Sequence, residues 1–219
     1  MEHPTVTAVV GTCLLLFVPL GAIGQELPTS WIPFTAKQVQ TYALDLPSGG
    51  PRGAELIGLY VRDSHGRSYN RLRVTSSPGS LPAYGMTDTA TLFDRPSQKF
   101  FQIDFVRKTF RIQDPDPSNR STEPLSREQF DKAHAGEKFL GKQVISGVEC
   151  EGFQVPTPHF KNHFNETCYA PALNFMVIRA TGYNPRKQRF EIRLEDIQAG
   201  REPDPSLFRL PDGFKEAKD

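Results

Sequence analysis

Two histidines four residues apart, His159 and His163, precede Glu166 and Cys168, and these residue types ligate metals or carry nucleophilic chemistry. On a helix this spacing would place both imidazole rings on one face. The prolines and asparagines around them favour a loop instead, and the set matches no closed zinc pattern. We therefore interpret the two histidines as part of a solvated loop and predict no metal site.

Cys168 allows two interpretations. With His163 as its base it would be a thiolate nucleophile, whereas a bond to Cys150 would abolish that chemistry. These two cysteines are the ones that remain if an N-terminal export segment is removed, and the sequence contains no Cys-x-x-Cys spacing. Since two lone cysteines in one exported domain more often pair than stay free, we predict a disulfide bond between Cys150 and Cys168.

Enzyme signatures are absent from the sequence. It contains no Gly-x-Ser-x-Gly elbow, no phosphate-binding glycine loop and no His-Glu-x-x-His motif. The acidic pairs Asp114 with Asp116 and Glu202 with Asp204 each enclose a proline, which favours turns over calcium binding. We therefore predict a protein without catalytic residues, cofactor or metal.

The first 24 residues differ in kind from the rest. No charged residue occurs from Thr5 to Gly24, and the apolar centre Cys13–Val18 precedes a small-residue site for cleavage before Gln25. The initial Met1–His3 lacks the usual Lys or Arg, so an uncleaved membrane anchor is the alternative. We predict a signal peptide over residues 1–24, cleaved near Gly24, and a periplasmic or secreted mature protein.

Composition limits the remaining chain to an ordinary globular domain. The 219 residues include 26 basic and 25 acidic side chains, 37% hydrophobic residues and 16 phenylalanines. This apolar content is enough for a core, and a net charge of +1 without a basic run argues against nucleic-acid binding. No internal repeat or second boundary is found, so we predict one β-rich domain over residues 25–219.

Alternation with period two is the dominant pattern and predicts half-buried antiparallel strands. It is clearest over Arg189–Glu195, where one face carries Phe190, Ile192 and Leu194 and the other carries Arg189, Glu191, Arg193 and Glu195. We expect the apolar face to point to the core, since a one-residue slip would bury four charges. The apolar residues of Leu207–Phe214 are expected to close the core.

Turn and cap residues divide these strands. Asp63–Gly66, Asp94–Ser97 and Ser146–Gly147 are typical of hairpin connections, which together predict a meander. Ser126 begins a capping-box pattern with a stop at Gly136, which predicts a helix of about ten residues. The expected fold class is mainly β (α+β), with one or two short helices.

Three ordered blocks carry a resemblance to a known group of proteins. Gly147–Phe153, Asn165–Leu173 and Arg193–Phe214 resemble a group of uncharacterised secreted bacterial proteins, which are similar to the LolA/LolB-like lipoprotein-carrier superfamily. The resemblance implies a strongly curved antiparallel sheet, or open half-barrel, around an apolar concavity, without catalytic residues. In that group an aromatic often occupies the position of Cys168, and the departure here supports a lineage-specific bond to Cys150.

These expectations favour two classes of function. The first is a non-enzymatic carrier or binding protein of the cell envelope, a monomer and at most peripheral to the membrane, for a lipid, a lipoprotein or another apolar ligand. The second is a protein-interaction or sensor module whose concavity is filled by side chains. A continuous apolar cavity of at least ~300 Å³, the lower size of ligand pockets, distinguishes the first class from the second.

Overall fold

The computed structural model describes residues 30–44, 52–76, 88–114, 123–156, 164–183 and 189–217. The expected signal peptide lies outside these residues, as do Asp116, His159 and His163.

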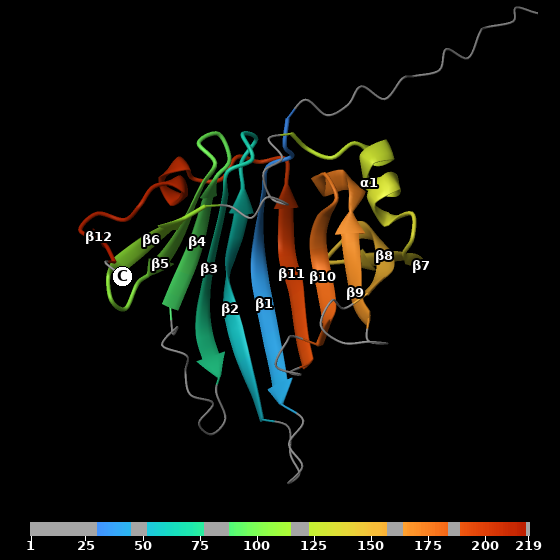
Figure 1. The fold of residues 1–219 in the computed structure, drawn as a ribbon, viewed down its shortest axis with the longest axis horizontal. Helices are drawn as coiled ribbons and strands as arrows, with labels where there is room; N and C mark the ends of the chain where they lie inside the picture. Colours follow the sequence, from blue (N-terminus) through green and yellow to red (C-terminus); the bar gives the residue numbers. More distant parts are fainter. Residues whose placement is uncertain are drawn as a thin grey trace, which may run out of the picture.

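Twelve strands of the described residues form one open sheet (Figure 1). Across the sheet the order is β12-β6-β5-β4-β3-β2-β1-β11-β10-β9-β8-β7, and the neighbours are antiparallel except for β12 and β6. The strands are β1 (Phe34–Leu44), β2 (Arg52–Arg62), β3 (Ser68–Ser76), β4 (Asp88–Asp94), β5 (Lys99–Asp104), β6 (Thr109–Gln113), β7 (Lys138–Ile145), β8 (Val148–Pro156), β9 (Phe164–Ala170), β10 (Met176–Tyr183), β11 (Arg189–Ala199) and β12 (Lys215–Glu216). The predicted mainly β class with a largely antiparallel sheet is confirmed.

The connectivity corrects the prediction of one simple meander. Strands β1 to β6 pair in chain order, as do β7 to β11, and these two meanders meet where β1 pairs with β11. The first described strand is therefore central to the sheet. Turn residues locate each hairpin but carry no information on which hairpins adjoin, because that pairing is non-local.

The predicted hairpin turns are confirmed. Asp63–Gly66 joins β2 to β3, and Asp94–Ser97 lies between β4 and β5. At Ser146–Gly147, between β7 and β8, both residues have positive φ, 49° and 78°. This is the conformation of a type I′ turn, whose twist matches that of the flanking strands.

The predicted facing of β11 is confirmed. Ile192 and Leu194 lie on the cavity side of the sheet, and Leu194 is buried. Glu191 and Glu195 lie on the other face, where Glu191 pairs with Arg179 and Glu195 pairs with Lys37. The cross-strand ion pairs keep these charged side chains half-buried rather than fully exposed.

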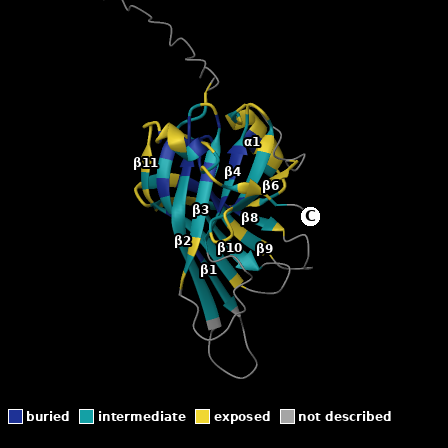
Figure 2. Cartoon of the chain, turned by 90° about the vertical axis from the view of Figure 1, so that its left-hand side faces the viewer, coloured by how far each residue is buried: buried dark blue, intermediate teal, exposed yellow. Residues whose placement is uncertain are grey.

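Buried residues gather toward one end of the strands (Figure 2). One cluster there combines Val61, Leu92 and Ile103 with Phe208 of the short 3₁₀ helix η3 (Pro205–Phe208). Other apolar residues of the C-terminal segment pack against the same cluster, and the Phe105 and Phe214 rings are 5.4 Å apart. The expected closing of the core by this segment is confirmed.

The predicted capped helix is present as α1 (Arg127–His134), eight residues rather than about ten. The Ser126 hydroxyl accepts from the Gln129 N–H at 3.1 Å, and the Gln129 side-chain oxygen accepts from the Ser126 N–H at 2.8 Å. The described residues also form a short 3₁₀ helix, η2, over Pro171–Leu173.

A disulfide bond joins Cys150 of β8 to Cys168 of β9, with Cα atoms 5.5 Å apart. The two strands are neighbours, and Cys168 lies opposite Gly152. Both sulfurs are buried in a cluster with Ala170, Leu173 and Leu194. The bond therefore cross-links β8 and β9 within the core.

Replacing both cysteines by alanine is expected to lower the free energy of unfolding by roughly 3 kcal/mol, because the closed loop no longer restricts the unfolded chain. Denaturant unfolding of the oxidised protein and the double variant measures this difference. Alkylation of Cys150 and Cys168 in non-reducing conditions, or equal unfolding midpoints with and without reductant, would contradict the bond.

Candidate functional site

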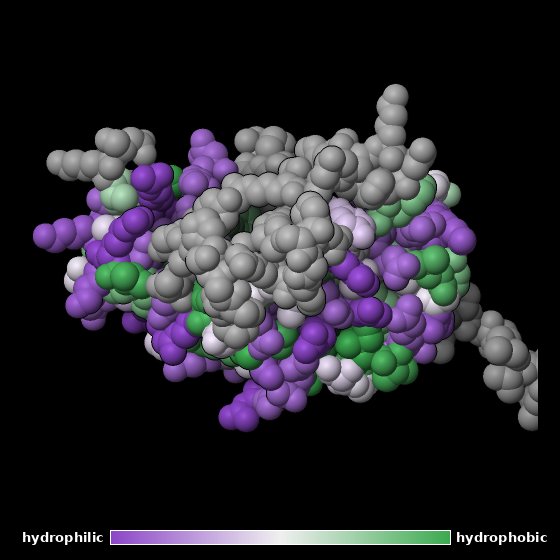
Figure 3. All heavy atoms as spheres, turned by 90° about the horizontal axis from the view of Figure 1, so that it is seen from below, coloured by the Kyte–Doolittle hydropathy of each residue, from purple (hydrophilic) through white to green (hydrophobic). Residues whose placement is uncertain are grey.

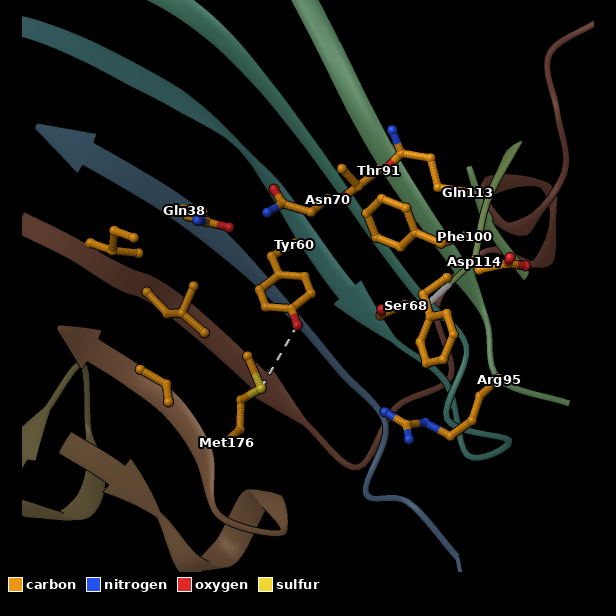
Figure 4. Close-up of a pocket in the computed structure, with 14 residues that line it drawn as sticks. Gln38, Tyr60, Ser68, Asn70, Thr91, Arg95, Phe100, Gln113, Asp114 and Met176 are labelled. Carbon is orange, nitrogen blue, oxygen red and sulfur yellow. Dashed lines mark hydrogen bonds between the residues drawn. The ribbon is translucent and has the colours of Figure 1, made fainter. Parts of the chain in front are cut away.

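A cavity of about 780 Å³ lies on one face of the sheet. Its walls come from β1 to β6 and from β10 and β11 (Figure 4). The lining residues are Gln38, Tyr60, Ser68, Asn70, Thr91, Phe93, Arg95, Phe100, Gln113, Asp114, Met176, Val177, Ile192 and Leu194. Strands β6 and β10 are seven positions apart in the sheet, roughly 34 Å if it were flat. Because both line one cavity, the sheet curves around it.

One part of the lining is apolar. Met176 and Val177 of β10, together with Ile192 and Leu194 of β11, form this wall. Tyr60 of β2 lies across from them, and its hydroxyl is 3.8 Å from the Met176 sulfur (Figure 4). Burial raises the pKa of Tyr60, so its hydroxyl stays neutral. These surfaces suit a hydrocarbon chain.

The remainder of the lining corrects the expectation of an apolar concavity. Among the described lining residues, Phe93 and Phe100 are the phenylalanines, and half of the side chains are polar. Because strand residues alternate between faces, neighbours such as Phe101 and Ile103 pack on the opposite face, under the C-terminal segment. The cavity exceeds ~300 Å³, the lower size of ligand pockets, but it is amphipathic rather than apolar.

A row of uncharged polar residues crosses the cavity wall. Gln38, Asn70, Thr91 and Gln113 come from β1, β3, β4 and β6 and lie on the same side of the cavity in Figure 4. Gln38 is 4% exposed, and its side-chain oxygen has no hydrogen-bond partner among the described residues. The Asn70 side-chain oxygen is also buried without such a partner. Buried amide oxygens normally accept a hydrogen bond.

Cationic side chains gather at the other end. The guanidinium carbon of Arg95, which lines the cavity, is 4.5 Å from the centre of the Trp31 ring. Arg62 lies 4.9 Å from the same ring and donates to the Ile32 and Leu173 carbonyls at 2.9 and 2.8 Å. Burial lowers the pKa of Arg62 to about 10 and also lowers that of Arg95. Arg62 therefore remains a cation at neutral pH, and both guanidinium groups lie against Trp31 at this end of the cavity.

Among the described members of the candidate sites in the sequence, Cys168 and Asp204 have structural roles, whereas Asp114 lines the cavity. Cys168 is bonded to Cys150, which excludes it as a thiolate nucleophile in this state. Asp204 accepts from the Ser206 N–H at 2.9 Å and begins η3. In the part of the chain that the structure describes, no group of three or more acidic, histidine or cysteine residues is placed to hold a metal.

Within the described ranges, no helix has the length and apolar character needed to cross a membrane. The face seen in Figure 3 shows hydrophilic and hydrophobic residues in small interspersed groups over the described surface. The cavity is therefore the feature of the described structure that best suits a binding function.

The fold and the cavity together define an open, curved β-sheet protein with a ligand-sized concavity. Comparison with solved structures finds similar chains at low sequence identity. A LolA superfamily protein, NE2245 from Nitrosomonas europaea, is 10% identical over 84% of this chain and 91% of that one, with a TM-score of 0.32.

Two further structures are similar. An uncharacterized conserved protein from Thermus thermophilus has a TM-score of 0.49 and 12% identity over 84% of this chain and 89% of that one. MucB, in a complex with MucA(peri), has a TM-score of 0.44 and 10% identity over 86% of this chain. This chain spans 57% of that MucB chain. No family model and no curated protein matches the sequence.

Proposed function

We propose that this protein is a non-enzymatic binding protein of the cell envelope that holds the hydrocarbon chain of an amphipathic ligand in its concave cavity. The cavity of about 780 Å³ carries the proposal, since it is well above the ~300 Å³ that small ligand pockets start from. Its apolar wall fits an acyl chain, and its row of uncharged polar side chains and the arginine at its other end fit polar groups of the same molecule. A lipid or an acylated protein has this chemistry.

Two features of the chain support a location in the cell envelope. The chain begins with an apolar segment that has a small-residue site before Gln25. The buried disulfide between Cys150 and Cys168 is stable in an oxidising compartment such as the periplasm. We propose a periplasmic or secreted mature protein that begins near Gln25, which N-terminal sequencing of an envelope fraction tests.

Affinity is expected to rise with acyl-chain length, because each buried CH₂ contributes about 0.8 kcal/mol. Displacement of a fluorescent fatty acid by the methyl esters of octanoate, dodecanoate and palmitate measures this dependence without a charged head group. A several-fold gain for each added pair of methylenes supports the proposal, even after part of the gain is lost to ordering of the chain. Equal, negligible displacement by all three would discard it and favour the interaction module.

Two neighbouring residues of β11 provide a matched test of where the ligand binds. Ile192→Asp places a carboxylate in the apolar wall and is expected to weaken binding of methyl palmitate by about tenfold or more. Glu191→Lys changes a charge on the opposite face and is expected to leave the affinity unchanged. Equal effects of the two substitutions would place the ligand elsewhere.

A further inference from the structure

The amide of Gln38 is a buried polar group without a described partner inside a cavity that also has an apolar wall. Gln38 is 4% exposed and lines the cavity, and its side-chain oxygen accepts no hydrogen bond from the described residues. An amide buried in this way normally destabilises a fold, because its interactions with water are lost and not replaced. A ligand that supplies the missing donor would remove this cost.

A second amide repeats the arrangement two strands away. Asn70 of β3 lines the same wall, and its side-chain oxygen is also buried without a partner among the described residues. Strand β2 lies between them, where Gly58 pairs with Gln38 and Tyr60 pairs with Asn70. Figure 4 shows the Gln38 and Asn70 amides on the same side of the cavity, with Thr91 next to Asn70. The wall therefore presents two uncharged amides to whatever occupies the cavity.

We propose that the cavity recognises a secondary amide, so that its ligand is an N-acylated amphiphile rather than a free fatty acid or an ester. This inference rests on the proposed function and specifies the ligand of the same cavity. A secondary amide has one N–H donor and one carbonyl acceptor. The primary amide of Gln38 is complementary to it, since its oxygen accepts from the ligand N–H and its NH₂ donates to the ligand carbonyl.

The charge of the wall favours an amide over an ionised head group at this position. The side chains of Gln38, Asn70, Thr91 and Gln113 are all uncharged. The cationic residues Arg62 and Arg95 contact Trp31 and Phe93 at the other end. A carboxylate beside Gln38 would lose its hydration without gaining a cation partner. A neutral amide loses less hydration free energy, and both of its polar groups form hydrogen bonds there.

N-methylpalmitamide and methyl palmitate form an isosteric pair of probes, because they differ by an N–H in place of the ester oxygen. Displacement titrations with the natural protein are expected to show about tenfold tighter binding of the amide, since the ester offers no donor to the buried oxygens. Methyl 3-hydroxypalmitate is the third probe and supplies a donor hydroxyl near the ester. Binding of this hydroxy ester as tightly as the amide would overturn the amide assignment in favour of a hydroxylated ligand.

Gln38→Leu removes the buried amide with little change in volume. It is expected to abolish the preference for the amide, so that N-methylpalmitamide and methyl palmitate bind with similar affinity. Without ligand, the variant should melt at a higher temperature than the natural protein, because an unpartnered buried polar group has been removed. Gln198→Leu is the control, since Gln198 is an exposed residue of β11 that does not line the cavity.

The possible failures are distinct. Equal binding of amide and ester, with no effect of Gln38→Leu on their ratio, would overturn the amide inference while the chain-length dependence still supported a carrier of acyl chains. Absence of displacement by every probe would overturn the proposed function as well. Loss of amide preference in Gln198→Leu would also contradict the inference, because that side chain lies outside the cavity.

Discussion

Phe130→Ala is expected to lower the free energy of unfolding by about 3–5 kcal/mol and to detach helix α1 from the sheet. Phe130 is fully buried and is the buried residue of this eight-residue helix. Its ring stacks on Phe175 at 4.1 Å and packs edge-on against Phe153 and Tyr169 at 5.6 and 5.2 Å. A helix this short is unstable alone in water, so its docking depends on this ring.

Denaturant unfolding measures the loss of stability, and hydrogen exchange shows whether the amides of α1 lose protection before those of the sheet. Lys132→Ala is the matched control, because Lys132 is an exposed residue of the same helix. It is expected to change the free energy of unfolding by less than ~0.5 kcal/mol. Unaltered protection of α1 in Phe130→Ala would mean that other contacts, such as the 2.8 Å ion pair of Arg127 with Glu151, hold the helix.

The phenylalanine content suggested a large apolar surface, but composition does not indicate where in the fold that surface lies. Phe130, Phe153 and Phe175 gather around α1, and another group packs with Phe208 under the C-terminal segment. Neither group lines the cavity. The sequence therefore predicted enough aromatic surface for a core. It did not predict that amide side chains line the concave wall beside Phe93 and Phe100.

Local signals were predictable because local chemistry determines them. Ser146–Gly147 forms its turn through backbone conformations that these residues tolerate, and Ser126 caps α1 through atoms three residues away. The alternation in β11 predicted which side chains share a face. It could not indicate that Met176 and Gln113 line the same cavity, because that depends on curvature summed over eight strands.

Irregularities that add to the curvature had no clear pattern in the sequence. The pairing of β1 with β11 shifts register between Thr35 and Lys37, next to Asp196, whose φ is 53°. The pairing of β10 with β9 shifts between Val177 and Arg179. Such bulges bend a strand and increase its twist. The sequence therefore did not predict the candidate site. Gln38 and Asn70 are ordinary strand residues in the sequence, and only the curvature of the sheet brings them to one cavity.

A further substitution tests how closely the strands that carry this site must approach. Gly58→Ala is expected to lower the free energy of unfolding by more than ~3 kcal/mol, or to prevent folding. A Cβ at Gly58 would collide with the Arg71 carbonyl oxygen and lie 2.9 Å from the Leu72 Cα. These are backbone atoms of β3 that cannot rotate away, so β2 and β3 would have to separate along a pairing that runs from Glu55 to Arg62.

Gly136→Ala is the matched control for this backbone clash. Gly136 is exposed just after α1, a Cβ there meets no atom within 4 Å, and its φ is not positive. The same addition of a methyl group should therefore be neutral or stabilise the protein by roughly 0.4–1 kcal/mol, because alanine lowers the conformational entropy of the unfolded chain. The denaturant midpoints of the two variants measure this difference in stability. If Gly58→Ala is as stable as Gly136→Ala, then β2 and β3 do not approach as closely as described, and the cavity wall between Gln38 and Asn70 has a different geometry.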